Sequence, residues 1–304
     1  MRKVHRVQMD KLLWKWLADG SHRYKKEYDL AIAFLEGGAT YYVGNYVKAK
    51  HKSAFVHVDY GLAGYTRMLD QGIYDRFDDI YAISDEVRKG FQRVYPEYKD
   101  KLSVFPNMID QDYIRRMATY GRGFEDNYSG FRILTVGRLT PQKAYDVAID
   151  AMAVLRMRGY RAKWYVLGEG QLREELEHRL TSYGLKEDFF LLGAKSNPYP
   201  FFQQCDIYVH ATRFEGKSIA VQEAQTLGCP IIVSDVPGNR EQIDHGVDGL
   251  ICSLNPEAVA DAIIELMNDK GERERFAAAA CLKQFNSKDA LEKILKVAKG
   301  ETEK

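Results

Sequence analysis

The sequence predicts an α/β fold with two domains, each built on a parallel β-sheet. The chain has 304 residues, of which 45% are hydrophobic and 29% charged, a globular composition with room for two domains. Short apolar runs alternate with helical patterns along most of its length. Because the runs are apolar throughout rather than at every second residue, they are typical of parallel strands that are covered on both faces.

The second half of the chain carries the clearer pattern. Six apolar runs predict strands at 132–139, 163–170, 189–194, 206–212, 230–235 and 248–254. Helical patterns lie between most of them, at Tyr145 to Arg158, Gln171 to Tyr183, Tyr199 to Gln204, Ser218 to Leu227 and Pro256 to Asn268. We therefore predict a parallel-sheet domain over 131–285, with a C-terminal helix or tail at 286–304.

The first half contains fewer units of the same kind. Strands are predicted at 29–35, 53–60, 79–85 and 101–107, with helices near 62–76 and 85–95. We expect a smaller α/β domain over 1–115. The polar, glycine-containing stretch at 116–130 is the predicted linker.

Composition argues against several classes of function. The formal net charge of +1 gives no global attraction for nucleic acid. The four cysteines are widely spaced without metal-site spacing, which indicates a reducing compartment and hence the cytoplasm. No apolar run approaches the ~20 residues that span a bilayer. Acidic pairs such as Asp78 and Asp79 lack a third ligand, so we predict no metal site.

The first 52 residues are locally basic and aromatic, with 11 Lys and Arg against five Asp and Glu. Within them, residues 10–20 form an amphipathic segment that contains two tryptophans and two lysines. Such a segment can lie on a membrane surface. Alternatively, its apolar side chains pack on the sheet of the first domain.

Two acidic residues eight positions apart, Glu215 and Glu223, mark the most informative stretch, residues 206–235. The stretch predicts a strand, a polar loop that contains Glu215, a helix that contains Glu223, and a second strand. In open α/β sheets, ligands bind beyond the carboxyl ends of the strands. Carboxylates there, beside helix N–H groups, suit a ligand that carries both hydroxyls and phosphates.

The turn after the strand at 132–139 carries Arg138 and Lys143, five positions apart. Arg offers a planar fork of donors and Lys a compact charge, the usual means of binding a phosphate or diphosphate. A solvated basic loop is the alternative reading.

Gly168 and Gly170 match half of a dinucleotide fingerprint, but Arg173 stands where a small residue is required, so a nicotinamide dehydrogenase is not expected.

In the predicted first domain, His57 and Asp59 lie at the carboxyl end of the apolar run 53–60. A histidine at that position can donate to a substrate oxygen or accept a proton. A lone histidine at the end of a strand is more often structural.

Taken together, these motifs resemble the second domain of retaining GT-B glycosyltransferases of family 4, in which two Rossmann-like domains face a cleft. The resemblance rests on GRLTPQKAYD, the VLGEG turn, FLLGAKSNPYPFFQQCDIYV, RFEGKSIAVQEAQTLGCPIIVSDVPG and HGVDGLIC, in this order. EGKSIAVQEA and FVHVDY are similar to the branch that builds bacterial capsular and cell-envelope polysaccharides. The resemblance implies transfer of a sugar from a nucleotide-sugar donor, with uridine the expected base and no metal or other cofactor, to a saccharide or lipid-linked acceptor.

The resemblance also implies roles for individual residues. Arg138 and Lys143 would bind the diphosphate of the donor, Glu223 the ribose hydroxyls, and Glu215 the donor sugar or a phosphate. His57 would face the reaction centre. The implied catalytic set is His57, Arg138, Lys143 and Glu215; the implied donor-binding set is Gly137, Arg138, Lys143, Gly168, Glu215, Gly216, Lys217, Ser218, Ile219 and Glu223.

Departures from the family pattern leave other readings open. Ala144 stands where a glycine usually follows the lysine, and Lys217 stands where Phe or Pro is common. No strand and glycine-rich loop precede Tyr28, so the first domain is expected to be incomplete. The chain could then be a donor-binding subunit that needs a partner, or an inactive remnant. A nucleotide-sugar epimerase is a third reading.

Overall fold

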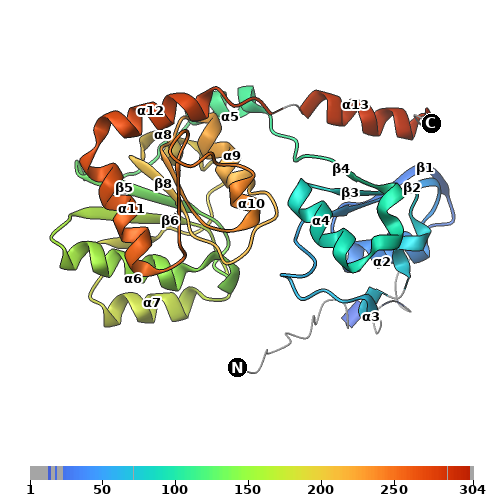
Figure 1. Cartoon of the computed structure of the whole chain (residues 1–304), viewed down its shortest axis with the longest axis horizontal. Coiled ribbons are helices and arrows are strands. Elements are labelled where there is room, and N and C mark those ends of the chain that lie inside the picture. Colours follow the sequence, from blue (N-terminus) through green and yellow to red (C-terminus); the bar gives the residue numbers. More distant parts are fainter. Residues whose placement is uncertain (1–12, 15–17, 19–22, 71, 286, 302–304) are drawn as a thin grey trace. The chain divides into compact units, whose positions relative to one another are not determined.

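A computed structural model describes residues 13, 14, 18, 23–70, 72–285 and 287–301 of the chain (Figure 1). The chain divides into two compact units. Unit 1 comprises Met1–Met108 and Asn286–Lys304, and unit 2 comprises Ile109–Phe285. Each unit is built around its own parallel sheet, which agrees with the predicted α/β class.

Unit 1 contains a four-stranded parallel sheet in the order β1-β2-β3-β4. Its strands are β1 (Glu27–Ala33), β2 (Lys48–Val56), β3 (Asp79–Ala82) and β4 (Leu102–Val104). Its helices are α2 (Gly38–Tyr46), α3 (Arg67–Asp70), α4 (Asp85–Val94) and α13 (Ser287–Ala298), with short 3₁₀ turns at Ile73–Arg76 and Pro96–Lys101. Ser84 caps α4, because its hydroxyl accepts a hydrogen bond from the Val87 N–H.

The two faces of this sheet are covered by different elements. Ala54, Val56 and Ile80 belong to the main core of the unit, which also takes in residues of α2 and α4. Phe55 and Tyr81, one position further along their strands, point to the opposite face, where Ile294 of α13 packs against their cluster. Successive strand residues point to opposite faces, so an apolar run without alternation is what a doubly covered strand requires.

Unit 2 contains a six-stranded parallel sheet in the order β10-β9-β8-β5-β6-β7. Its strands are β5 (Phe131–Val136), β6 (Ala162–Leu167), β7 (Phe189–Leu191), β8 (Ile207–His210), β9 (Ile231–Ser234) and β10 (Leu250–Cys252). Its helices are α5 (Gln111–Ala118), α6 (Tyr145–Met157), α7 (Arg173–Ser182), α8 (Tyr199–Gln204), α9 (Ile219–Thr226), α10 (Pro237–Arg240), α11 (Pro256–Asn268) and α12 (Lys270–Cys281). The strand order reverses between β5 and β8.

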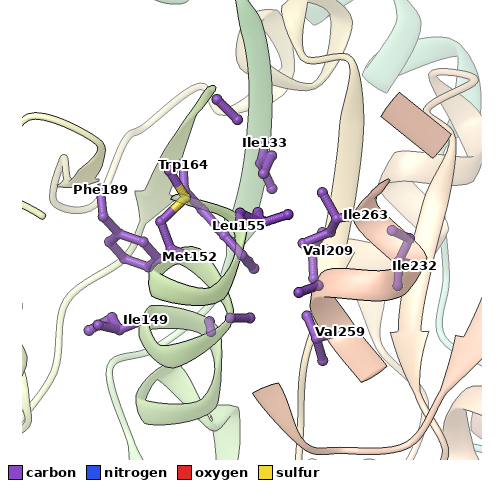
Figure 2. Packing of buried hydrophobic residues seen from close by; sticks show 14 of the residues in the cluster. Ile133, Ile149, Met152, Leu155, Trp164, Phe189, Val209, Ile232, Val259 and Ile263 are labelled. Atoms are coloured by element: carbon purple, nitrogen blue, oxygen red, sulfur yellow. The ribbon is translucent and has the colours of Figure 1, made fainter. Parts of the chain in front are cut away.

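The main core of unit 2 lies between the sheet and α6, α7 and α11 (Figure 2). Trp164 of β6 is fully buried there, and its indole N–H donates to Thr135 Oγ1 at 3.0 Å. Met152 and Leu155 of α6 pack in the same cluster. Each such side chain contributes about 1.5–3 kcal/mol by its removal from water. The opposite face buries a second cluster against α8 and α9.

The structure differs from the predicted boundaries in three places. The segment 116–130, predicted as a linker, groups with unit 2, because Phe124 packs on Tyr165 at 4.4 Å and Asp126 pairs with Arg132 at 2.8 Å. The polar composition of this segment gave no indication of these two contacts. The helices α2, α5, α10 and α12 were not predicted, and β2 begins and ends earlier than the run 53–60 indicated.

The amphipathic segment 10–20 lies mostly outside the described residues. Of its tryptophans, Trp14 is described, and its ring packs edge-on against Tyr42 at 5.9 Å and Tyr46 at 6.3 Å. This contact favours packing on unit 1 for that side chain. Among the residues that the structure describes, no helix combines the length and apolar character needed to cross a bilayer.

Candidate active site

The candidate site lies in unit 2 at the point where the strand order reverses. β5 and β8 are adjacent parallel strands, so the loops that follow them leave the same edge of the sheet. The basic loop, residues 137–144, leads into α6, and the donor loop, residues 211–218, leads into α9. Those two helices pack on opposite faces of the sheet, which opens the crevice where α/β sheets bind ligands.

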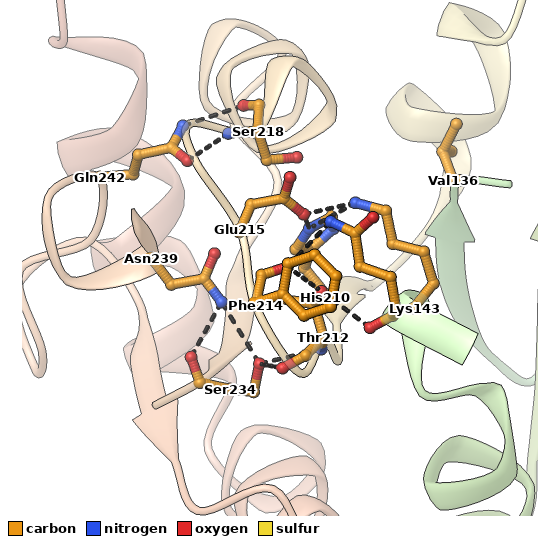
Figure 3. Close-up of polar contacts among 12 residues, drawn as sticks. Val136, Lys143, His210, Thr212, Phe214, Glu215, Ser218, Ser234, Asn239 and Gln242 are labelled. Atoms are coloured by element: carbon orange, nitrogen blue, oxygen red, sulfur yellow. Dashed lines mark hydrogen bonds and ion pairs between the residues drawn. The ribbon is translucent and has the colours of Figure 1, made fainter. Parts of the chain in front are cut away.

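The two loops bring Lys143, Glu215 and His210 together (Figure 3). Lys143 Nζ lies 2.5 Å from Glu215 Oε2 and 3.4 Å from His210 Nε2. His210 Nε2 is in turn 3.0 Å from Glu215 Oε2. The Lys143 and Glu215 side chains are only 14% and 12% exposed, and His210 is fully buried. The predicted residues Lys143 and Glu215 therefore form one buried charge pair.

The cluster holds Glu215 ionised. Burial alone would raise the pKa of Glu215, but the hydrogen bond from His210 and the charge of Lys143 outweigh it and lower the pKa to about 2. Burial and the nearby Lys143 charge lower the pKa of His210. We infer a neutral imidazole whose Nε2–H donates to Glu215, while Nδ1 accepts from the Tyr208 hydroxyl at 3.0 Å.

The basic loop is shaped by close backbone contacts. The Tyr145 hydroxyl donates to Gly137 O at 2.8 Å. A Cβ on Gly168 would lie 1.9 Å from Gly137 O, so only glycine lets the turn after β6 approach this loop. Ala144 adopts a left-handed conformation at φ 44°, ψ 39°, the one non-glycine residue with positive φ in the described part of the chain. This is the position where the family pattern has glycine.

Gln142 joins the basic loop to the donor loop. Its side-chain N–H donates to Phe214 O at 2.9 Å. Its backbone carbonyl accepts from Thr212 Oγ1 at 3.1 Å and from the Arg213 N–H at 2.8 Å. Arg213 also pairs with Asp146 at 2.6 Å. These bonds hold the two loops to each other within unit 2.

Arg138 does not take part in this cluster. Its side chain is exposed and makes no hydrogen bond or ion pair with the residues that the structure describes. It therefore stands at the edge of the site as an unpaired positive charge, in contrast to the buried Lys143.

The donor loop is fixed from its other side by the segment around α10. A Cβ on Gly238 would lie 2.3 Å from Glu215 O and 2.4 Å from Gly216 O. Gln242 holds Ser218 through both backbone groups, with Oε1 accepting from Ser218 N–H at 2.7 Å and Nε2 donating to Ser218 O at 2.9 Å (Figure 3). The N–H of Ser218 is therefore hydrogen-bonded within the protein, to the side chain of Gln242.

Glu223 lies one helical turn further along α9 and has a different environment from Glu215. The Tyr199 hydroxyl donates to Glu223 Oε1 at 3.1 Å. Burial raises the pKa of Glu223 to about 7, although the bond from Tyr199 acts in the opposite direction. The two predicted glutamates therefore differ in charge near neutral pH. Ile219, at the start of the same helix, is half exposed.

His57 follows β2 in unit 1. Its backbone N–H donates to Glu36 Oε2 at 3.0 Å, and its ring packs against Phe34 at 5.3 Å. Its Nδ1 is buried without a hydrogen-bond partner. Asp59 is engaged elsewhere, since its carboxylate accepts from Arg93 at 2.8 Å. Within the described ranges, no three His, Cys, Asp or Glu side chains come close enough to hold a metal ion.

Sequence reasoning missed His210 and Gln242. His210 ends the apolar strand β8, immediately before the donor loop, and the rule applied to His57 would have selected it. Gln242 gave no such signal, because its partner Ser218 is distant in sequence and the contact depends on the packing of α10.

Comparison with known proteins agrees with this geometry. Residues 125–283, just over half of the chain, match the family model for glycosyl transferases group 1. The chain belongs to this family. The matched region contains both loops of the candidate site.

Named relatives and solved structures extend the comparison. An uncharacterised glycosyltransferase of Methanocaldococcus jannaschii is 26% identical over 235 residues, covering 71% of this chain and 57% of that protein. An N-acetylgalactosamine-N,N'-diacetylbacillosaminyl-diphospho-undecaprenol 4-α-N-acetylgalactosaminyltransferase of Campylobacter jejuni is 29% identical over 203 residues, covering 64% and 54%. This chain thus spans about half the length of these curated relatives. The Anabaena HepE structure in complex with UDP matches with a TM-score of 0.73 at 16% identity, over 96% of this chain and 82% of that one, which shows the shared GT-B fold.

Proposed function

We propose that this chain acts as a glycosyltransferase that moves a sugar from a UDP-sugar to a saccharide or lipid-linked saccharide acceptor, with retention of configuration, in the synthesis of a cell-envelope polysaccharide. The observation that carries the proposal is the buried Lys143–Glu215 pair at the point where the strand order of unit 2 reverses. Family membership and the names of the relatives agree with it.

In this proposal Lys143 stabilises the departing nucleoside diphosphate. Negative charge develops on the diphosphate as the glycosyl–oxygen bond breaks, and a cation fixed in a buried site stabilises that charge without reorganising. Glu215, which accepts a hydrogen bond from His210, holds the ammonium in place before the donor binds. Arg138 adds a second positive charge from the edge of the site. No bound metal takes part in the proposed reaction.

We assign the two glutamates to different parts of the donor. Glu215 is an ionised acceptor, and a phosphate would repel it, so we assign it to hydroxyls of the transferred sugar. Glu223 and Tyr199 are assigned to the ribose hydroxyls. No carboxylate is assigned as a covalent nucleophile. Retention would then follow from attack of the acceptor on the face from which the diphosphate leaves.

The proposed class of acceptor and the proposed location of the reaction are inferred from the names of the relatives. The name of the Campylobacter protein specifies a diphospho-undecaprenol-linked acceptor, and that of an Escherichia coli relative specifies a UDP-galactose donor. We extend these classes, a lipid-linked saccharide and a UDP-sugar, to this chain. Such an acceptor would place the reaction at the cytoplasmic face of a membrane.

The test is calorimetric titration of the purified chain with UDP, GDP and ADP, followed by a transfer assay with the matching nucleotide sugars in the presence of a chelator. We expect UDP to bind tightest, and Glu223→Ala to weaken its binding. Selective binding of GDP or ADP would overturn the choice of UDP. Binding without transfer to any saccharide or lipid-linked acceptor would favour a donor-binding subunit that needs a partner. Absence of nucleotide binding by a folded sample would overturn the proposal.

A further inference from the structure

We propose that Gln242 positions the donor loop, and that Lys283 couples this loop to the two segments through which the chain enters and leaves unit 2. The inference rests on the proposed function, because it concerns how the same donor site is controlled. It is carried by a continuous series of hydrogen bonds within unit 2, from Gln111 at one end to Ser218 at the other.

The first step is the grip of Gln242 on Ser218. Both backbone groups of Ser218 bond to the one amide side chain, and both residues are buried. A carboxamide supplies a donor and an acceptor at the same time, which neither a carboxylate nor a hydrocarbon of similar size can do. Ser218 directly precedes α9 and lies three positions after Glu215, so the grip fixes the end of the donor loop next to the charge pair.

The second step is the bond from Lys283 to the backbone of Gln242. Lys283 Nζ donates to Gln242 O at 2.6 Å, and Gln225 Nε2 donates to the same oxygen at 2.8 Å. Lys283 also forms an ion pair with Asp248, a carboxylate that is only 1% exposed. Loss of the ammonium would leave the buried Asp248 carboxylate without a counter-ion, although the Asp244 N–H and Gln225 would still donate to it, so the ion pair holds the ammonium at this point.

The third step is the pair of hydrogen bonds that Gln111 forms with Lys283 and Phe285, which joins the segment that enters unit 2 to the segment that leaves it. The Gln111 side chain donates to Lys283 O at 3.0 Å and accepts from the Phe285 N–H at 3.2 Å. Gln111 begins α5, just after the chain enters unit 2 at Ile109, and Phe285 is the last residue of that unit. One amide therefore clamps the entering and leaving segments together, next to the lysine that reaches Gln242.

Nucleotide binding and the conformation of residues 283–285 are therefore expected to affect each other. A change in the path of residues 283–285 displaces the Lys283 ammonium, and with it the Gln242 carbonyl and the amide that grips Ser218. By linkage, a nucleotide that orders the donor loop must stabilise the clamp at Gln111 by the same coupling free energy. Donor binding and the state of the crossing segments thus influence each other without any contact between Lys283 and the nucleotide.

The experiment measures UDP affinity and amide hydrogen exchange in the full chain. In the wild type we expect UDP to slow exchange at Phe285 by about threefold or more, because its N–H bonds to the clamp. Gln242→Glu loses the donor to Ser218 O and is expected to weaken UDP binding about tenfold and to abolish this protection. Gln111→Ala, which leaves no buried charge unpaired, is expected to speed exchange at Phe285 and to weaken UDP binding about threefold.

The matched control is Gln284→Ala, which removes an exposed side chain between the same two residues and is expected to change neither measurement. Failure of the wild type to bind any of UDP, GDP and ADP would overturn the proposed function itself. Wild-type binding with unchanged affinity and protection in Gln242→Glu would overturn the positioning role. Faster exchange at Phe285 in Gln111→Ala, with UDP affinity unaltered, would overturn the coupling.

Discussion

Lys143 Nζ lies 2.5 Å from Glu215 Oε2, and this ion pair is one of the contacts that join the loop after β5 to the loop after β8. Both side chains are largely buried, so the pair is only weakly screened by water. The carboxylate fixes the position of the ammonium, and the neutral imidazole of His210 in turn donates a hydrogen bond to that carboxylate. A positive charge is therefore in place before a nucleoside diphosphate arrives.

Replacement of Lys143 by Ala is expected to lower turnover by about 10²-fold or more at saturating UDP-sugar, because the fixed charge that meets the leaving group is lost. Lys143→Arg keeps the charge in a different shape and is expected to retain more activity than Lys143→Ala. Steady-state kinetics, with thermal unfolding to confirm folding, would measure both variants. Equal turnover in the wild type and Lys143→Ala would contradict the role.

Arg138→Ala is expected to lower turnover while leaving the free energy of unfolding almost unchanged. The exposed Arg138 side chain has no polar partner among the described residues, so its removal is expected to change the free energy of unfolding by no more than about 0.5 kcal/mol. Turnover should still fall by about 10²-fold if the guanidinium meets the diphosphate. Chemical denaturation and kinetics on one preparation would test both parts. Full activity would leave Arg138 as a solvated surface charge.

Much of this site was accessible from the sequence, and the rest depends on packing. Lys143 and Glu215 were predicted separately, each as a polar residue after an apolar strand, and the strand order brings them together. His210 was missed although it ends an apolar run, the same signal that selected His57. Gln242 was missed because a glutamine in a loop carries no periodic signal. The α2 helix was missed because GATYYVGNY combines glycines with residues that favour strands.

Gly238→Ala is expected to displace the donor loop. The added methyl group would overlap the carbonyl oxygens of Glu215 and Gly216, which are backbone atoms that cannot move independently. We expect destabilisation of about 1–3 kcal/mol together with weaker nucleotide binding. Gly271→Ala, in α12 with only the Asp269 side chain nearby, is the matched control and should leave binding unchanged. Calorimetry and denaturation would measure both variants, and wild-type affinity in Gly238→Ala would show that loop position does not control binding.

The pH dependence of nucleotide binding is expected to report on Glu223. Burial raises its pKa from 4.5 to about 7, so the group favours the protonated state in the folded chain. Its contribution to stability is complete below pH 4.5 and is lost as the pH rises through about 7. Binding has the opposite slope, because the ribose hydroxyls need the ionised acceptor. UDP affinity should therefore increase between pH 6 and pH 8, about tenfold at most.

The phosphates of UDP also titrate near this range, so the useful quantity is the affinity of the wild type divided by that of Glu223→Gln at each pH. The glutamine keeps the size of the side chain and its carbonyl acceptor but cannot ionise. Titration of the ligand cancels in the ratio, which leaves the contribution of the carboxyl group. A ratio that rises through pH 7 places the ionisation at Glu223, whereas a ratio that stays constant from pH 6 to pH 8 rules out its ionised form as the ribose acceptor.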